Sequence, residues 1–277
     1  MTLGSALALL QRDGLDRLDA QMLLLMVMQR APHDRAWLMA HEEDDLSPAA
    51  EKALSHLAQR RRRGEPMAYL RGEQEFFGLS LRVDASVLVP RADTETLVHW
   101  ALDVVDSLER HATLLDLGTG SGAIALALKA SRAALTVTAT DASKAALDVA
   151  RCNAQRLGLE VAFFQGNWLE AVTGQTFDVI VSNPPYIATG DHHLGALTHE
   201  PGSALTSGPD GLDDIRTLVA SAPNSLQPSG WLLLEHGHDQ ASAVRSLLTQ
   251  AGFERVSSRT DLAGIERCSG GRWPVRR

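Results

Sequence analysis

A tetrapeptide in the second half of the chain, Asn183-Pro184-Pro185-Tyr186, combines residue types that suit the binding of a flat –NH2 group. It follows the apolar run 177–181, which is typical of a buried strand. Proline lacks a backbone N–H and keeps the preceding residue out of the helical region, so the strand must end here. We therefore expect the Asn183 side chain and the Pro184 carbonyl to lie on a stiff turn beside an aromatic ring, where both can accept hydrogen bonds.

A glycine-rich segment forms a second candidate binding feature. It consists of Gly118, Thr119, Gly120, Ser121 and Gly122. Glycine lets the backbone turn tightly and approach a ligand closely. An acidic residue, Asp141, follows about 20 residues later, where nucleotide-binding folds place the carboxylate that accepts hydrogen bonds from ribose hydroxyls. The loop and Asp141 together predict a site for a cofactor that carries a nucleoside.

The loop alone leaves the cofactor open, because Gly118-x-Gly120-x-x-Ala123 also satisfies the dinucleotide fingerprint. Two observations argue against a dehydrogenase. Asp116, just before the loop, favours a positively charged cofactor over a pyrophosphate at a helix N-terminus. In addition, no segment suggests a hydride-transfer site, whereas the turn at Asn183 suits an –NH2 group.

Strands and helices alternate from residue 113 onward. Strands are expected over 113–117, 135–140, 160–165, 177–182, 230–235, 253–258 and 265–270, and helices over 92–110, 122–130, 143–157, 211–222 and 239–251. This alternation predicts an α/β fold, a mainly parallel sheet with helices on both faces. Ligands bind at the carboxyl ends of such strands, so Asp116, Asp141 and Asn183 should converge.

The region before residue 91 differs from this pattern. Residues 1–72 are predicted to be helical, with Asp19 capping the apolar stretch 20–28, and 73–90 is predicted to form a β-hairpin linker to a larger domain, 91–277. The basic run 60–63 is expected to be a solvated last turn of a helix, favoured by the helix dipole. A docking patch for an acidic or RNA-bearing partner is the alternative.

Composition restricts the class of protein. The 277 residues include 44% hydrophobic and 22% charged residues, as in ordinary globular proteins. A formal net charge of −8 argues against a dedicated nucleic-acid binder. Cys152 and Cys268 lie far apart, so neither a disulfide framework nor a zinc site is suggested. The apolar run 22–28 is too short to span a membrane and no signal peptide is evident, so we expect a cytoplasmic protein without membrane contact.

Two further groups of residues receive a structural interpretation. The pairs His192-His193 and His236-x-His238 lack a convincing third ligand, so we expect surface or loop histidines and no metal. Asp93 and Glu95 could form a catalytic carboxylate pair. Because they begin a predicted helix, where the dipole favours acids, we expect them to order the loop instead.

Several segments resemble those of a known family. They are 65–72 (Glu-Pro-Met-Ala-Tyr-Leu-Arg-Gly), 75–78 (Glu-Phe-Phe-Gly), 89–95 (Val-Pro-Arg-Ala-Asp-Thr-Glu), 200–201 (Glu-Pro) and 232–237 (Leu-Leu-Leu-Glu-His-Gly). With the glycine loop and the tetrapeptide, they resemble the signature segments of the bacterial release factor glutamine methyltransferases, the HemK-like family. The resemblance covers nearly the whole chain and is weakest in the first 45 residues.

The resemblance implies a class I S-adenosylmethionine-dependent methyltransferase fold, Rossmann-like with seven mostly parallel strands, and a helical domain over 1–72 for substrate recognition. It implies methyl transfer to the glutamine side-chain nitrogen in the Gly-Gly-Gln tripeptide of peptide chain release factors 1 and 2, with S-adenosylhomocysteine as product. The loop, Asp141 and Trp168 would hold the cofactor, and Asn183 would lie between cofactor and substrate. Asn167 departs from the acidic residue often found before this tryptophan, which should weaken adenine binding modestly.

Two rival functions remain open from the residues. An adenine-N6 DNA methyltransferase or an rRNA guanine methyltransferase can carry the same tetrapeptide, although the net charge and the missing basic recognition segment speak against it. A non-catalytic module that binds a nucleotide cofactor is the rival from another class. Loss of methyl transfer on replacement of Asn183 would separate it from an enzyme.

Overall fold

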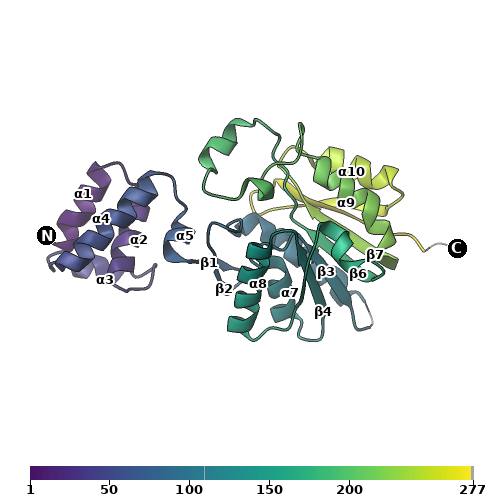
Figure 1. Cartoon of the computed structure of the whole chain (residues 1–277), viewed down its shortest axis with the longest axis horizontal. Coiled ribbons are helices and arrows are strands. Elements are labelled where there is room, and N and C mark those ends of the chain that lie inside the picture. The colour runs from purple at the N-terminus through teal and green to yellow at the C-terminus, as the bar shows by residue number, and fades with distance from the viewer. Residues whose placement is uncertain (109, 276–277) are drawn as a thin grey trace. The chain divides into compact units, whose positions relative to one another are not determined.

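The computed structural model describes residues 1–108 and 110–275, and the chain divides into two compact units, Met1–Gly72 and Glu73–Arg277 (Figure 1). Each unit has a hydrophobic core of its own. Within the described ranges, no helix is both long and apolar enough to cross a membrane.

The first unit consists of helices. They are α1 (Leu3–Arg12), α2 (Arg17–Val27), α3 (Arg35–Ala40), α4 (Pro48–Arg62) and α5 (Met67–Arg71). Leucines from several helices form its core, among them the fully buried Leu3, Leu23 and Leu24. The cap predicted at Asp19 is wrong: Asp16 caps α2 by accepting from the Asp19 backbone N–H at 2.8 Å. The helix therefore begins one turn earlier than its apolar stretch.

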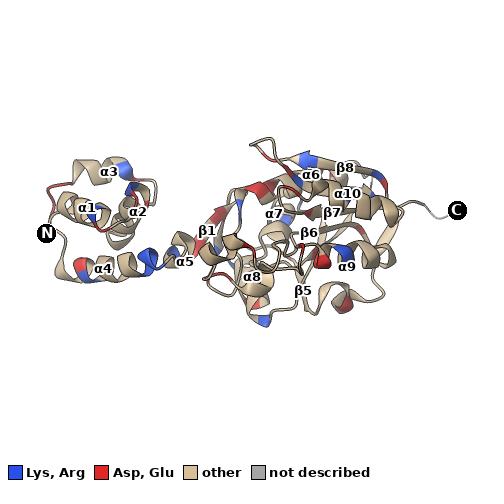
Figure 2. Ribbon diagram, turned by 90° about the horizontal axis from the view of Figure 1, so that it is seen from above, with Lys and Arg blue, Asp and Glu red and all other residues tan. Residues whose placement is uncertain are grey.

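Figure 2 shows basic residues in blue at the end of α4. Three of them, Arg60, Arg61 and Arg62, form ion pairs within their own unit. Arg61 Nε lies 2.5 Å from Asp19 Oδ2, and the Arg60 guanidinium donates to both carboxylate oxygens of Glu65. Arg62 lies 3.7 Å from Asp13. Because these guanidinium groups have internal acidic partners, the run connects α4 to α2 and to the following loop, which supports the structural interpretation over a docking patch.

The second unit contains a short hairpin and a seven-stranded sheet. The hairpin pairs β1 (Glu73–Phe76) with β2 (Leu79–Arg82). In spatial order, the sheet strands are β5 (Ala162–Gln165), β4 (Thr136–Asp141), β3 (Thr113–Leu117), β6 (Phe177–Ser182), β7 (Leu226–Glu235), β9 (Glu266–Arg272) and β8 (Glu254–Thr260). The first five are parallel, and β9 is antiparallel to both neighbours. The predicted α/β fold is confirmed.

Helices cover both faces of this sheet (Figure 1). They are α6 (Glu95–Asp106), α7 (Ala123–Ser131), α8 (Lys144–Leu157), α9 (Asp213–Ser221) and α10 (Ala241–Gln250). Side chains alternate along a strand, so Leu114 packs in the core with α6 and α7, while Leu115 and Leu117 pack with α9 and α10. Both faces are therefore buried, as expected of a parallel sheet.

Two elements of the second unit differ from the predicted bounds by more than two residues. The helix predicted over 92–110 begins as a 3-10 turn, η1 (Ala92–Thr94), before α6, and its residue 109 lies outside the described residues. Strand β7 begins at Leu226, earlier than the predicted 230, because its residues 227–230 bulge opposite the step from Phe177 to Val179 and accommodate Pro228.

Candidate active site

A cavity of about 310 Å³ lies at the carboxyl ends of β3, β4 and β6. Ligand pockets commonly begin at about 300 Å³. The residues predicted from the sequence that line it are Gly118, Thr119, Gly120, Ser121, Asp141, Trp168, Asn183 and Pro185. Asn167 also lines it, whereas Gly122, Pro184 and Tyr186 do not. Of the three residues expected to converge, Asp141 and Asn183 line the cavity together with the glycine loop, whereas Asp116 does not line it.

The glycine loop turns over the end of β4. The backbone N–H groups of Gly118 and Thr119 both donate to the Thr140 carbonyl at 2.9 Å. Gly118 has φ +69°, which favours glycine. Gly122 serves packing instead of lining the cavity: a Cβ there would lie 3.0 Å from the Leu126 side chain.

Asp116 lies beneath the loop and does not line the cavity. Its Oδ2 accepts hydrogen bonds from the Thr119 hydroxyl at 2.6 Å and from the Ala125 N–H at 3.2 Å. Burial raises the pKa of Asp116 to about 7, with the Thr119 hydrogen bond opposing the rise. The carboxyl group therefore connects the loop to the start of α7. From the sequence we expected the Asp116 carboxyl group to favour a positively charged cofactor. In the structure its direct contacts are instead with Thr119 of the loop and Ala125 of α7.

Asp141 joins the glycine loop to the start of α8. One carboxylate oxygen accepts from the Gly120 N–H at 2.9 Å and the other from the Ser143 N–H at 2.8 Å. A carboxylate has about four lone-pair sites, so acceptor capacity remains for a ligand. Asp141 is thus oriented by backbone groups and half-buried at the cavity wall.

Trp168 forms another wall. It begins the 3-10 helix η2 (Trp168–Val172) and has φ +49°, which is unusual for a residue other than glycine. Its ring lies over the glycine loop: a Cβ built on Gly118 would come within 3.2 Å of the ring. The Thr140 hydroxyl donates to the Trp168 carbonyl at 3.3 Å. This ring offers a flat apolar surface to a base.

The tetrapeptide follows β6 as predicted, and its Asn183 side chain is held from one side. Asn183 Nδ2 lies 3.3 Å from the hydroxyl oxygen of Thr94, in η1. The Tyr186 hydroxyl lies 3.5 Å from Oε1 of Glu235, at the end of β7. Burial, with the nearby Glu235 carboxylate, raises the pKa of Tyr186 far above its usual range, so the phenol keeps its proton.

A second, smaller cavity of about 80 Å³ adjoins the first. It is lined by Leu88, Arg91, Asn183, Tyr186, Ile187, Leu197, Ala204 and Leu205. Four of these residues also line the larger cavity: Leu88, Arg91, Asn183 and Ala204. Asn183 therefore stands where the two cavities meet. Pro184 is buried and its side chain lines neither of them.

Glu200 connects the two segments that border these cavities. It is 6% exposed, and its Oε2 accepts from the Val89 backbone N–H at 3.0 Å while Oε1 lies 2.5 Å from Arg91. Sequence reasoning assigned no role to Arg91, Thr94, Glu200 or Glu235. All four lie in the segments 89–95, 200–201 and 232–237, which resemble signature segments of a known family. That resemblance was the one feature of the sequence that could have indicated a role for them.

Asp93 and Glu95 order the loop, as expected. Glu95 accepts a hydrogen bond from the Phe77 N–H at 3.0 Å, and Asp93 lies 3.3 Å from the Arg267 guanidinium. They do not form a carboxylate pair that faces the larger cavity, because neither lines it. Thr94, between them in sequence, does line it.

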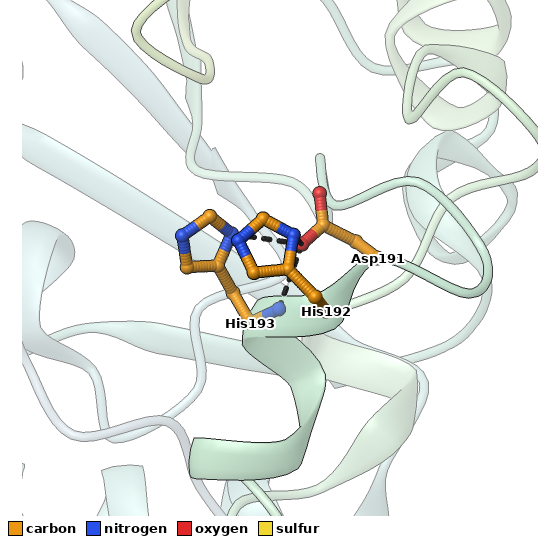
Figure 3. A group of neighbouring side chains, drawn as sticks. All are labelled: Asp191, His192 and His193. Carbon is orange, nitrogen blue, oxygen red and sulfur yellow. Dashed lines mark hydrogen bonds and ion pairs between the residues drawn. The ribbon is translucent and has the colours of Figure 1, made fainter.

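The histidines divide into surface and core positions. His192 and His193 are exposed, as expected (Figure 3). We expected no third potential ligand beside them, and this is wrong: the potential ligand atoms of Asp191, His192 and His193 lie within 4.8 Å of one another. Asp191 accepts from the His193 backbone N–H at 2.8 Å and so caps the 3-10 helix η3 (His192–Ala196). His236 lies in the loop directly after β7, as expected, but it is not at the surface. It is fully buried and bonds Ser269 Oγ at 2.8 Å, because β7 continues to its neighbour Glu235.

Comparison with known proteins places these features in a family. Residues 2–72 match the family model "PrmC N-terminal domain", and residues 99–208 match "Methyltransferase small domain". A release factor glutamine methyltransferase of Bordetella pertussis is 51% identical over 266 residues, which are 95% of this chain and 97% of that protein. One from Xylella fastidiosa (strain Temecula1) is 49% identical over 265 residues, 95% of each chain.

The chain belongs to the release factor glutamine methyltransferases. It is therefore an S-adenosylmethionine-dependent enzyme with a class I methyltransferase fold, as the motifs predicted. A methyltransferase from Pyrococcus furiosus shares this fold, with a TM-score of 0.54 and 20% identity over 80% of this chain and 100% of that one. Neither a dehydrogenase nor a non-catalytic module is compatible with membership of this family.

We expect Gly118→Ala to weaken S-adenosylmethionine binding about tenfold, because the new methyl group would press on the Trp168 ring in addition to straining a backbone at φ +69°. The left-handed region alone costs about 1–2 kcal/mol for an L-residue. Calorimetric titration would measure the dissociation constant. Gly158→Ala is the matched control: Gly158 has φ +65°, and its added Cβ meets no atom within 4 Å. Equal binding by both variants would contradict the assigned position of Trp168.

Proposed function

We propose that this enzyme transfers a methyl group from S-adenosylmethionine to the side-chain nitrogen (N5) of the glutamine in the Gly-Gly-Gln tripeptide of peptide chain release factors 1 and 2. The position of Asn183, where the two cavities meet, carries the proposal. The larger cavity suits a nucleoside-bearing cofactor. The smaller one, about 80 Å³ with mostly apolar walls, suits a single extended side chain. An acceptor of N–H hydrogen bonds at their junction fits a carboxamide as the methylated group.

The residues around the larger cavity fit S-adenosylmethionine. Asp141 has acceptor capacity for the two ribose hydroxyls, and the Trp168 ring gives a flat surface for the adenine. Asn167 lines the same cavity, and its side-chain oxygen can accept from the adenine amino group. The backbone from Gly118 to Ser121 would follow the cofactor closely, with no side chain in the way at Gly118 and Gly120. When bound, S-adenosylmethionine supplies an electrophilic methyl group on a sulfonium.

The protein must orient a poor nucleophile. The lone pair of a carboxamide nitrogen is delocalised into its carbonyl. With Asn183 Oδ1 and the Pro184 carbonyl oxygen accepting its two N–H bonds, the nitrogen is fixed in place and its electron density is directed toward the methyl group. Such positioning can lower a barrier by about 7–11 kcal/mol when the near-attack geometry is well held.

The remaining residues of the tetrapeptide support this arrangement. Tyr186 lines the smaller cavity, where its ring can pack against the amide plane, and Pro185 stiffens the turn. After methyl transfer the nitrogen has become acidic and releases its extra proton, so no strong general base is needed before attack. A side chain that accepts hydrogen bonds is therefore sufficient at position 183.

The first unit is proposed to recognise the release factor. Its residues 2–72 match the PrmC N-terminal domain. Its basic run is occupied by Asp13, Asp19 and Glu65, which disfavours RNA as the ligand of that run. We infer that the enzyme works in the cytoplasm, where release factors act, without a metal and without membrane or dedicated nucleic-acid contacts.

Labelled S-adenosylmethionine and purified release factor 1 or 2 test this function. We expect label on the release factor with its wild-type tripeptide and none on its Gln→Ala variant. Parallel reactions with duplex DNA and with rRNA should give no label. Equal labelling of both release factor forms, or labelling of nucleic acid alone, would overturn the substrate assignment.

A further inference from the structure

A chain of polar groups runs from the Asn183 side chain past Thr94, at the wall of the larger cavity, to the buried Glu235. Thr94, 4% exposed, has its hydroxyl oxygen 3.3 Å from Asn183 Nδ2. The Thr94 hydroxyl is near enough to the carboxyl group of Glu235 to favour its ionised form, and this carboxyl group is 1% exposed. Glu235 Oε2 is buried and has no hydrogen-bond partner among the described residues, so it can accept a proton donor such as this hydroxyl. Glu235 Oε1 accepts from the Tyr186 hydroxyl at 3.5 Å. Asn183 is thus linked to the buried Glu235 carboxyl group through Thr94, and Tyr186 is linked to it directly.

The direction of these hydrogen bonds determines which way the Asn183 amide faces. A hydroxyl has one proton and two lone pairs, and an ionised carboxylate only accepts. If Thr94 donates its proton to Glu235, its oxygen must accept from Asn183. The amide then turns its NH2 to Thr94 and its oxygen to the cavities. The opposite orientation would present an NH2 group to the NH2 group of the substrate, and neither can accept.

We propose that Thr94 and Glu235 are positioning residues, which fix the Asn183 amide with Nδ2 toward Thr94 and Oδ1 toward the substrate. This inference rests on the proposed role of Asn183. Their location fits the role, because the 92–94 turn that carries Thr94 is itself held by the ion pair between Asp93 and Arg267. Neither Thr94 nor Glu235 needs to touch the reacting atoms.

The direction in which the hydrogen bonds between Asn183, Thr94 and Glu235 run, from donor to acceptor, depends on the ionisation of Glu235. A protonated Glu235 can donate to Thr94, and Thr94 can then donate to the amide oxygen of Asn183, which favours the wrong orientation. The titratable and charged groups that face Glu235 are Asp93, Tyr186, Arg267 and Cys268. Burial raises the pKa of Glu235 to about 7 against the opposing hydrogen bond from Thr94. We therefore expect kcat to rise between about pH 6 and pH 8.

Isosteric substitution at position 94 provides the first test. Thr94→Val removes the hydroxyl and keeps the shape, so kcat should fall about ten- to a hundredfold, the scale of a small misplacement in the active site. Because Thr94 also lines the larger cavity, kcat is measured at saturating S-adenosylmethionine, so that a change in cofactor affinity does not contribute to the fall. Thr94→Ser restores the hydroxyl and should restore most of kcat. Thr138→Val makes the same exchange at another buried threonine, on β4 and outside the cavity lining, and is the control for folding.

The pH profile tests the carboxyl group. In Glu235→Gln the rise of kcat through pH 7 should disappear, and kcat should stay low because a glutamine can donate to Thr94 at any pH. The parallel Asp116→Asn variant checks the other carboxyl group whose pKa is raised to about 7. A rise that persists in Glu235→Gln and disappears in Asp116→Asn would overturn the role of Glu235.

A measurement without turnover separates this inference from the proposed substrate. The chain contains four asparagines, Asn153, Asn167, Asn183 and Asn224, so selective 15N labelling gives four side-chain NH2 signals. The Asn183 signal, identified by its loss in Asn183→Asp, should exchange with solvent faster in Thr94→Val and be unchanged in Thr138→Val. Unchanged exchange in Thr94→Val overturns the inference even if release factor methylation is observed. Faster exchange supports it even if the glutamine substrate proves wrong.

Discussion

Replacement of Asn183 by alanine should lower kcat for release factor methylation about a hundredfold to a thousandfold, the range found when one preorganised polar partner is removed from an active site. The variant loses the side-chain oxygen that would hold one N–H of the substrate glutamine, so its nitrogen is no longer oriented toward the methyl donor. Binding of S-adenosylmethionine should be largely kept, because the glycine loop, Asp141 and Trp168 are unchanged.

Single-turnover methylation and calorimetric titration of the cofactor would measure these two effects separately. Asn224→Ala is the matched control, because Asn224 is an exposed asparagine of the same unit and lines neither cavity. Unchanged turnover by Asn183→Ala would contradict the proposal that the Asn183 side chain orients the substrate amide. A parallel loss of cofactor affinity and turnover would mean that Asn183 mainly holds the cofactor.

Replacement of Asp141 by alanine should raise the dissociation constant of S-adenosylmethionine about thirtyfold to a thousandfold. Hydrogen bonds to a charged group contribute about 1.5–3 kcal/mol each, and tenfold in affinity corresponds to about 1.4 kcal/mol. The carboxylate is expected to hold the ribose, and it also orders the loop through the Gly120 N–H and α8 through the Ser143 N–H. The substitution would therefore remove a direct contact with the ribose and also loosen the cavity wall formed by the glycine loop.

Asp148→Ala separates this effect from a general loss of charge on α8. Asp148 is half-exposed, pairs with Lys144 and Arg151 on the same helix, and lines neither cavity. Its removal should leave cofactor affinity unchanged. If Asp141→Ala binds S-adenosylmethionine as tightly as the wild type, the ribose is held elsewhere.

The elements with strong periodicity could be predicted from the sequence. The parallel strands β3 and β6 have the predicted bounds, because apolar runs that end in a glycine or in Asn-Pro leave little freedom in placing a buried strand. The loop and Asp141 were placed by the rule that ligands bind at the carboxyl ends of parallel strands. The early start of β7 could not be seen, because a strand through Pro228 needs a bulge at the proline, and local pattern does not reveal it.

The contacts that hold the tetrapeptide in place could not be derived from the spacing of residues along the sequence. Thr94, Glu235 and Asn183 are far apart in sequence, and only the folded sheet brings them together. His236 illustrates the same limit: it lies in a loop, as expected, but its burial next to the end of β7 could not be predicted. Burial of a single polar residue is a tertiary property, which local pattern does not encode.

The position of β9 has a consequence for the order in which the enzyme becomes complete during synthesis. Although β9 follows every other strand along the chain, it lies between β7 and β8 and pairs with both. A nascent chain can form the five parallel strands first, but β8 has no partner in the sheet until residues 266–272 leave the ribosome. Cys268 of β9 pairs with Glu235. The Glu235 carboxyl group, which we propose helps to orient Asn183, is therefore enclosed only when β9 has paired. A partly synthesised chain should consequently bind the cofactor before it can methylate a release factor.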